Sequence, residues 1–199
     1  IDEATDLLYE KSRIEAQYLK SDFGGGGRGT KRLGPDKTKE EIKAILIEME
    51  SFSRNDIGNI YFESAVSPKP GNRLLQLEVE VLCDRLGNIT VDPNSRYVCV
   101  NDKNQKFTEW GFQKGEDCGI SEELLAKCRE EAIHIAKSVN YNGKGTIEFL
   151  LDVDDNGDGT SSALELNGRV QCEWKALALL SKQGHEITNT HALQVLSAC

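Results

Sequence analysis

Strict alternation of apolar and polar residues is the feature that most constrains this chain. Only an extended strand sends successive side chains to opposite faces. Between residues 75 and 81, leucines and valines alternate with Gln76, Glu78 and Glu80, and residues 165–173 alternate in the same way without a break. The chain must therefore contain strands with one polar face.

Helices are predicted alongside these strands. Thr38 and Glu41 form a capping box ahead of an apolar stripe, and Ser121 precedes a second stripe. Further helices are predicted at residues 2–11, 174–182 and 191–198, and further strands at 14–20, 57–63, 89–91, 97–100, 106–110, 146–151 and 162–166. The combination predicts an α+β fold.

The segment Pro68-Lys69-Pro70-Gly71 is the best internal boundary, because prolines and glycine interrupt both helices and strands. It predicts a small lobe over residues 1–66 and a larger antiparallel-sheet lobe over residues 67–199.

Composition excludes several classes of function. The net charge of −9, from 24 Lys+Arg against 33 Asp+Glu, argues against a nucleic-acid surface, and no apolar run approaches the ~20 residues that cross a bilayer. The 6 cysteines are scattered without a C-x-x-C pair, which is typical of buried thiols in a reducing compartment. We therefore expect a cytoplasmic protein with no nucleic-acid or membrane partner. The chain lacks an initiator Met, so a piece of a longer protein is expected.

Glycines dominate residues 24–29 and satisfy G-x-G-x-x-G. A dinucleotide-binding fold is rejected, because the short segment 30–33 leads into Gly34-Pro35 instead of a long helix. A Walker A loop is rejected because Gly-Lys-Ser/Thr is missing. Two interpretations remain for this hairpin tip: a flexible surface turn, or a mobile lid that approaches a polyphosphate beside Lys20 and Arg28.

Carboxylates and amides share one face of the alternating stretch at 165–173. Glu165, Asn167, Arg169, Gln171 and Glu173 lie on that face, and Gly168 permits the bend that would gather them. Glu148, on a neighbouring predicted strand, could supply a second carboxylate. Two carboxylates and an amide oxygen suit Mg²⁺ or Mn²⁺. The alternative is a solvated strand face with ordinary ion pairs.

With these segments in order, the sequence resembles the ATP-grasp portion of biotin carboxylases, the ATP-dependent component of acyl-CoA and pyruvate carboxylases. The resemblance is carried by residues 18–29 (lysine and glycine lid), by residues 145–150 (first carboxylate strand) and by the E-x-N-x-R-x-Q-x-E signature at residues 165–173. It implies an ATP-grasp fold with a small glycine-lid lobe and a larger antiparallel-sheet lobe. It also implies a ligase that uses ATP, Mg²⁺ or Mn²⁺, and bicarbonate to carboxylate carrier-bound biotin.

The resemblance also implies roles for individual residues. The residues implied for ATP binding are Lys20, Gly24, Gly25, Gly26, Gly27, Glu63, Val66 and Glu148. Those implied for metal binding are Glu148, Glu165 and Asn167. Those implied for bicarbonate are Lys106, Arg169, Gln171 and Cys172, with Glu173 as general base and with Arg169 and Lys106 in catalysis. The implied partners are biotin carboxyl carrier and carboxyltransferase domains or subunits, and an oligomer is possible in the full-length protein.

The sequence departs from the family pattern at three places. The family's histidines are replaced by Gln76 and Asn104, and its His-Pro is replaced by Trp174-Lys175. We expect the isolated chain to fold without turning over, since the family's amino-terminal lobe is absent. An inactive ATP-grasp scaffold of a carboxylase complex is the alternative.

A different class of function is suggested by residues 152–158, which match the first half of a calcium-binding EF-hand loop. The twelfth position is Ala163 where a bidentate glutamate is needed. We therefore interpret the segment as a hairpin turn.

Overall fold

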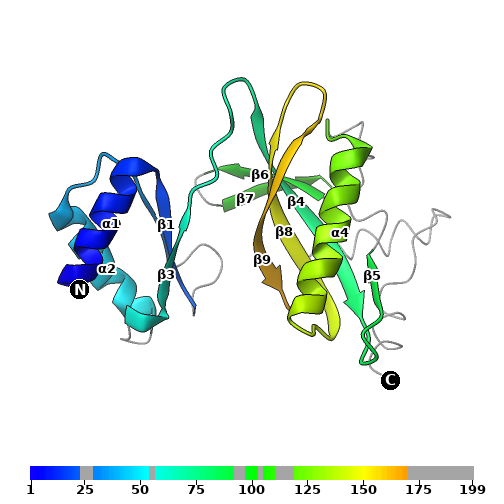
Figure 1. The fold of residues 1–199 in the computed structure, drawn as a ribbon, viewed down its shortest axis with the longest axis horizontal. Coiled ribbons are helices and arrows are strands. Elements are labelled where there is room, and N and C mark those ends of the chain that lie inside the picture. The colour runs from blue at the N-terminus through cyan, green and yellow to red at the C-terminus, as the bar shows by residue number, and fades with distance from the viewer. Residues whose placement is uncertain (23–28, 54–56, 92–96, 103–104, 111–118, 170–199) are drawn as a thin grey trace. The chain divides into compact units, whose positions relative to one another are not determined.

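The computed structural model describes residues 1–22, 29–53, 57–91, 97–102, 105–110 and 119–169, with the backbone alone for 97–102 and 105–110 (Figure 1). The chain divides into two compact units, Ile1–Val66 and a second unit that begins at Ser67. The boundary lies just before the proline-rich break. In the described part of the chain, no helix is long and apolar enough to cross a membrane.

The first unit packs two helices on a small antiparallel sheet. Its elements are α1 (Asp2–Ile14), β1 (Gln17–Ser21), β2 (Thr30–Leu33), α2 (Lys39–Phe52), the 3-10 turn η1 (Ile57–Asn59) and β3 (Ile60–Ser64), with strand order β2-β1-β3. Its core consists of Leu8, Leu19, Leu33, Ile42, Leu46 and Met49. The predicted hairpin is formed by β1 and β2. Residues 23–28 between these strands lie outside the described residues, so the expected mobility of the lid stays a prediction.

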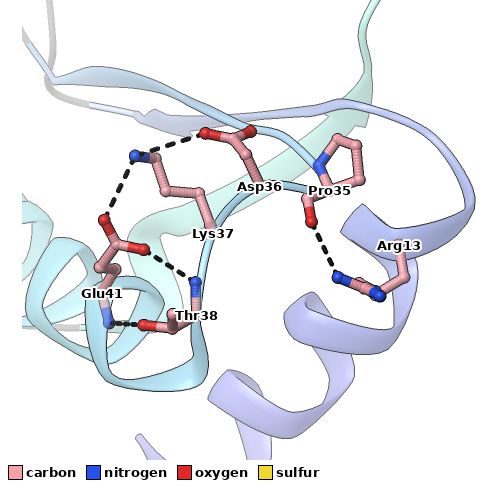
Figure 2. A network of polar contacts seen from close by, with 6 residues as sticks. All are labelled: Arg13, Pro35, Asp36, Lys37, Thr38 and Glu41. Atoms are coloured by element: carbon pink, nitrogen blue, oxygen red, sulfur yellow. Dashed lines mark hydrogen bonds and ion pairs between the residues drawn. The ribbon is translucent and has the colours of Figure 1, made fainter.

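Polar contacts fix where the helices of this unit begin and end. The predicted capping box is present: Glu41 N donates to Thr38 Oγ1 (3.2 Å), and Thr38 N donates to Glu41 Oε2 (2.8 Å) (Figure 2). Arg13, from α1, donates to the carbonyl of Pro35 (2.9 Å), which ties the end of α1 to the turn before α2.

Two predicted boundaries in this unit are wrong. Helix α1 continues to Ile14, and the first strand begins only at Gln17. Basic residues Lys11 and Arg13 in the last turn favour the helix at the point where alternation suggested a strand. The third strand begins at Ile60, because residues 57–59 form the 3-10 turn.

The second unit is an antiparallel sheet covered on one face by a helix (Figure 1). Its elements are β4 (Arg73–Cys83), β5 (Ile89–Val91), β6 (Tyr97–Asp102), β7 (Gln105–Trp110), α4 (Glu122–Ser138), β8 (Gly143–Val153) and β9 (Gly159–Asn167). The strand order is β7-β6-β4-β8-β9, and β5 also pairs with β4. These elements occur in the predicted order, but β8 and β9 each begin three residues before the predicted strands at 146–151 and 162–166, because pairing of Gly143 with Cys83 and of Gly159 with Val153 extends the sheet. The helices predicted at 174–182 and 191–198 lie outside the described residues.

The apolar face of β4 and β8 packs against α4. Buried residues of the strands meet buried residues of the helix in one cluster that includes Leu77, Val79, Val81, Ile147, Phe149, Leu151, Leu125, Cys128 and Ala132. Ser121 caps the helix by accepting a hydrogen bond from Leu124 N (3.2 Å), as predicted. The helix therefore occupies one face of the sheet and leaves the polar side chains of β4 and β8 on the other.

The segment that resembles half an EF-hand is a tight turn between β8 and β9. Asp154 Oδ1 accepts hydrogen bonds from Asn156 N (2.8 Å) and Asp158 N (3.0 Å). Gly157 adopts a positive φ of 85° and its carbonyl accepts from Ser121 N (2.8 Å). The structure confirms the hairpin-turn interpretation, since the Asp154 carboxylate is engaged in closing the turn.

Candidate functional site

The polar face of β4 and β8 is buried, although alternation by itself would place it in solvent. The exposed fractions are 0% for Glu78, 2% for Glu80, 7% for Lys144 and 4% for Glu148. Removing a charged group from water is costly unless it has partners or a ligand. A buried face with this many ionisable groups therefore marks a candidate functional site.

Strand register places three carboxylates in a row on this face. Glu148 of β8 lies directly opposite Glu78 of β4 on one side and Glu165 of β9 on the other. We call these three residues the carboxylate row. Like charges directly opposite one another in a sheet are destabilising, so the row needs hydrogen-bond donors or a bound cation to offset its charge.

An irregularity in β9 brings Glu165 onto this face. Glu148 pairs with Glu165, but the next residue, Phe149, pairs with Ala163, so Leu164 is an extra residue in β9. With regular pairing beyond Ala163, Glu165 would lie opposite Ile147 and share the apolar face. β-bulges commonly re-aim side chains beside active sites.

Two amide side chains orient the carboxylates. Asn167 Nδ2 donates to Glu148 Oε1 (2.9 Å) and to Glu165 Oε1 (3.0 Å), so it bridges the two strands. Gln76 Nε2 donates to the other oxygen of Glu148. The structure thus brings together the three residues that the sequence proposes as metal ligands, on one face of the sheet.

The donor set fits a magnesium ion that arrives with phosphates. Among the described residues, no three His, Cys, Asp or Glu side chains are grouped so as to hold a metal by themselves. Mg²⁺ is usually bound through one or two carboxylates together with substrate phosphates and water. Glu148 and Glu165 would supply the carboxylates, and the neutral amide N–H group of Asn167 lies between them.

In the first unit, the structure brings Lys20 and Glu63 together. Lys20 of β1 lies opposite Tyr61 of β3, and Glu63, two residues further along β3, lies opposite Tyr18. The Lys20 ammonium group forms an ion pair with the Glu63 carboxylate, and their side chains are 19% and 36% exposed. The predicted phosphate-binding lysine and the predicted adenine-binding residue therefore share one face of this sheet.

Comparison with known proteins identifies the family. The family model for the carbamoyl-phosphate synthase L chain, ATP binding domain, matches residues 17–190. This chain belongs to that family.

The relatives carry the names of carboxylases. Acetyl-CoA carboxylase 1 of Arabidopsis thaliana is 31% identical over 155 residues, which are 78% of this chain and 6% of that protein. The chloroplastic Biotin carboxylase 1 of Populus trichocarpa is 31% identical over 166 residues, which are 82% of this chain and 28% of that protein. The chain therefore spans less than a third of these curated relatives.

A solved structure gives the same assignment. The complex of Campylobacter jejuni biotin carboxylase with β-γ-ATP superposes with a TM-score of 0.68 and 26% identity, over 98% of this chain and 40% of that one. The resemblance to biotin carboxylases and the ATP-grasp fold are both confirmed. The chain is an ATP-grasp domain of the carboxylase type.

The other residues predicted for this ATP-grasp domain are placed less fully. Val66 is half-buried at the end of the first unit, and Arg169 is exposed just after β9. Lys106 lies in β7 opposite Asn101 of β6, with its backbone alone described. The remaining predicted site residues, and two of the departures from the family pattern, lie outside the described residues: Gly24, Gly25, Gly26, Gly27, Gln171, Cys172, Glu173, Asn104 and Trp174.

Glu78 is not among the site residues that the sequence predicts. Its alternation with Leu77 and Val79 was visible, but alternation does not reveal which residue of another strand lies opposite. The same holds for the buried Lys144, which no motif includes.

Proposed function

We propose that this chain is the ATP-binding part of a biotin carboxylase, which uses ATP and bicarbonate to carboxylate biotin on its carrier. The observation that carries the proposal is the pair Glu148 and Glu165, opposed across two strands and bridged by the Asn167 amide. A sheet that keeps a buried and an exposed carboxylate together on one face holds a site for the cation of a metal-bound triphosphate.

Each residue has a chemical task under this proposal. Lys20 binds ATP phosphates beneath the glycine lid, and Glu63 with Val66 holds the adenine. The guanidinium of Arg169 binds bicarbonate through two hydrogen bonds, with support from Lys106. Positioning matters most, because bicarbonate is a poor nucleophile toward phosphorus. Glu148, Glu165 and Asn167 would hold magnesium or manganese, which would offset charge on the phosphates.

Proton transfer is assigned to Glu173, the last residue of the E-x-N-x-R-x-Q-x-E signature. Glu173, close in sequence to Arg169, accepts the bicarbonate proton, which makes the bicarbonate oxygen a better nucleophile. That oxygen attacks the γ-phosphorus and ADP leaves. The carbon–oxygen bond to the phosphate then breaks, the carboxyl group bonds to a ureido nitrogen of biotin, and the leaving phosphate takes the proton from that nitrogen, so atoms and charge balance over the sequence.

The second candidate function is an ATP-grasp module that serves a carboxylase complex without catalysis. The departures at Gln76, Asn104 and Trp174 favour it. Against it, Gln76 still donates a hydrogen bond to Glu148, so this position keeps a role in orienting a carboxylate. We favour the active enzyme, cytoplasmic and joined to carrier and carboxyltransferase domains or subunits, with the isolated chain inactive.

The test separates metal binding from proton transfer in the full-length protein. Glu165→Gln should weaken Mg²⁺-ATP binding, because the cation loses a charged oxygen. Glu173→Gln should leave nucleotide binding nearly intact and lower the single-turnover rate by roughly 10²–10⁴-fold, the range for a general base. Glu123→Gln, on the exposed side of α4, is the matched control.

Three outcomes contradict parts of the proposal. Equal loss of Mg²⁺-ATP binding in Glu165→Gln and Glu173→Gln would show that the division of roles is wrong. ATP binding without bicarbonate- and biotin-dependent turnover in the full-length protein would favour the scaffold. Turnover by the 199-residue chain alone would refute its expected inactivity.

A further inference from the structure

The end of α4 fixes the position of one aromatic side chain, that of Tyr141. Asn140 adopts a positive φ of 49°, its N–H group donates to the carbonyl of Lys137 (3.1 Å), and Tyr141 N donates to the carbonyl of Ala136 (2.9 Å). This pair of hydrogen bonds is the Schellman motif that closes many helices. The Tyr141 hydroxyl donates to the carbonyl of Lys144 (2.9 Å). The half-buried ring is therefore held at both ends.

The Tyr141 ring covers the end of the β8–β9 ladder. The last pair of that ladder is Thr146 with Asn167, so Gly145 and Gly168 are the first residues beyond it. A methyl group on Gly145 would lie 2.8 Å from Tyr141 Cε1 and 2.9 Å from the hydroxyl oxygen, closer than side chains approach one another. A methyl group on Gly168 would lie 3.5 Å from the same oxygen. The tip of the ring therefore lies against both glycines.

Gly168 stands between two residues with different proposed tasks. Asn167 is held by its ladder partner, Thr146, and by its hydrogen bonds to Glu148 and Glu165. Arg169, which the proposed function assigns to bicarbonate, follows the last ladder pair, so pairing with β8 does not fix its position. A contact at Gly168 is therefore placed to affect the arginine more than the proposed metal ligands.

We infer that Tyr141 is a positioning residue for bicarbonate binding. Its hydroxyl, anchored on the Lys144 carbonyl, sets where the chain leaves β9 at Gly168 and so where Arg169 is held. This inference rests on the proposed function, since it takes Arg169 as the residue that binds bicarbonate. Position is critical for this substrate, because a misplacement of about 1 Å can cost about 10²-fold in rate.

A purely structural role for Tyr141 makes a different prediction. If the side chain only fills the core between α4 and β8, the ring matters and the hydroxyl does not. Loss of packing would also affect nucleotide and bicarbonate alike, since both sites depend on the same sheet. Two variants distinguish the roles: Tyr141→Phe keeps the ring and removes the hydroxyl, whereas Gly145→Ala keeps the hydroxyl and forces the tip of the ring to shift.

The experiment compares these two variants with the wild type in the full-length protein. Tyr9→Phe is the matched control, because it removes the hydroxyl of a partly buried tyrosine in the first unit. The kcat and the KM for bicarbonate are measured at saturating MgATP and biotin. Binding of MnADP is measured by calorimetry, and thermal unfolding is followed in parallel.

We expect kcat/KM for bicarbonate to fall on the order of 3–10-fold in Tyr141→Phe, mainly through KM, since loss of one anchor should misplace Arg169 by a fraction of about 1 Å. Gly145→Ala should lose at least as much. MnADP affinity should stay unchanged in both variants, and Tyr9→Phe should match the wild type throughout. If Gly145→Ala does not fold, Tyr141→Phe still decides, because it removes a single oxygen atom and keeps the packing.

The outcomes separate this inference from the proposed function. Absence of bicarbonate-dependent turnover in the wild type would contradict the proposed function, and the inference with it. An active wild type whose bicarbonate kinetics are unchanged in Tyr141→Phe would refute the inference alone, and a lowered unfolding temperature in that case would assign the hydroxyl to stability. Equal losses of MnADP affinity and of kcat/KM for bicarbonate would also refute it, because the effect would not be specific to Arg169.

Discussion

Replacing Asn167 by Asp should make the stability of the second unit depend on bound metal. Asn167→Asp removes the amide that donates to both Glu148 (2.9 Å) and Glu165 (3.0 Å), and it adds a carboxylate beside them. A hydrogen bond to a charged group contributes about 1.5–3 kcal/mol, and the bond to the buried Glu148 should be at the upper part of that range. The bond to the exposed Glu165 adds little.

Repulsion adds to this loss. A new charge at about 5 Å from Glu148, at an effective dielectric constant of about 20, costs about 3 kcal/mol by Coulomb's law, and less where solvent reaches it. We therefore expect the free energy of unfolding without metal to fall by about 3–5 kcal/mol. Bound Mg²⁺ should recover much of this, because ligand that binds only the folded state stabilises it by mass action.

The assay is urea unfolding of the 199-residue chain, followed by tryptophan fluorescence with and without millimolar Mg²⁺ and ADP. Both tryptophans, Trp110 and Trp174, belong to the second unit by sequence, so the signal reports on the unit that holds the site. Asn156→Asp, in the exposed β8–β9 turn, makes the same chemical change away from the row and is the control. Equal recovery by Mg²⁺ in both variants would refute the reasoning.

Three further predictions follow from individual contacts. Thr38→Ala should destabilise the first unit by about 1 kcal/mol in thermal unfolding, because it removes the hydrogen bond to Glu41 N, whereas Thr38→Ser should not. Gln76→Leu should lower both MgADP affinity and the stability of the second unit, because Glu148 loses a hydrogen-bond donor, and Gln76→Glu should lower both further. A change in stability alone would limit Gln76 to a structural role. Burial raises the pKa of Cys128 to about 11, so between about pH 9 and 11 the folded state keeps the thiol proton that the unfolded state releases. The free energy of unfolding should therefore fall as pH rises through this range, and Cys128→Ala should flatten that dependence in urea titrations.

Long stretches of alternating residues predicted the strands well, whereas short stretches did not predict where elements begin and end. The alternation around Leu77 and Val79 fixes a strand because many residues agree, and Ser121 marks the start of α4 because its cap is a local interaction. The ends of α1 and β3 were wrong, since Ile14 and Ile57 satisfy a strand pattern as readily as a helical turn. Ends of elements depend on a few weak local terms, which tertiary packing readily overrides.

The candidate site was predictable in its residue types but not in its pairing. Glu165 and Asn167 share a face by alternation, so their grouping follows from the sequence. That Glu78 completes a row with Glu148 depends on strand register, which non-local contacts decide. The burial of Glu80 with Lys144 depends in addition on packing over that face, and no local pattern reports packing.

The bulge at Leu164 decides on which face of the sheet the alternating polar residues of β9 lie. Alternation puts Glu165 and Asn167 on one face but does not say whether that face meets α4 or the carboxylates of β4 and β8. The extra residue shifts the register so that Glu165 opposes Glu148 and Asn167 opposes Thr146. The folded chain then tolerates two opposed carboxylates by means of neutral amides, from Gln76 and Asn167, so the negative charge of the pair is oriented but not cancelled. Cations in those positions would have stabilised the sheet and abolished its attraction for a metal. Under the proposed metal-binding role, neutral donors are therefore the residue type that suits these positions, and Gln76 is one.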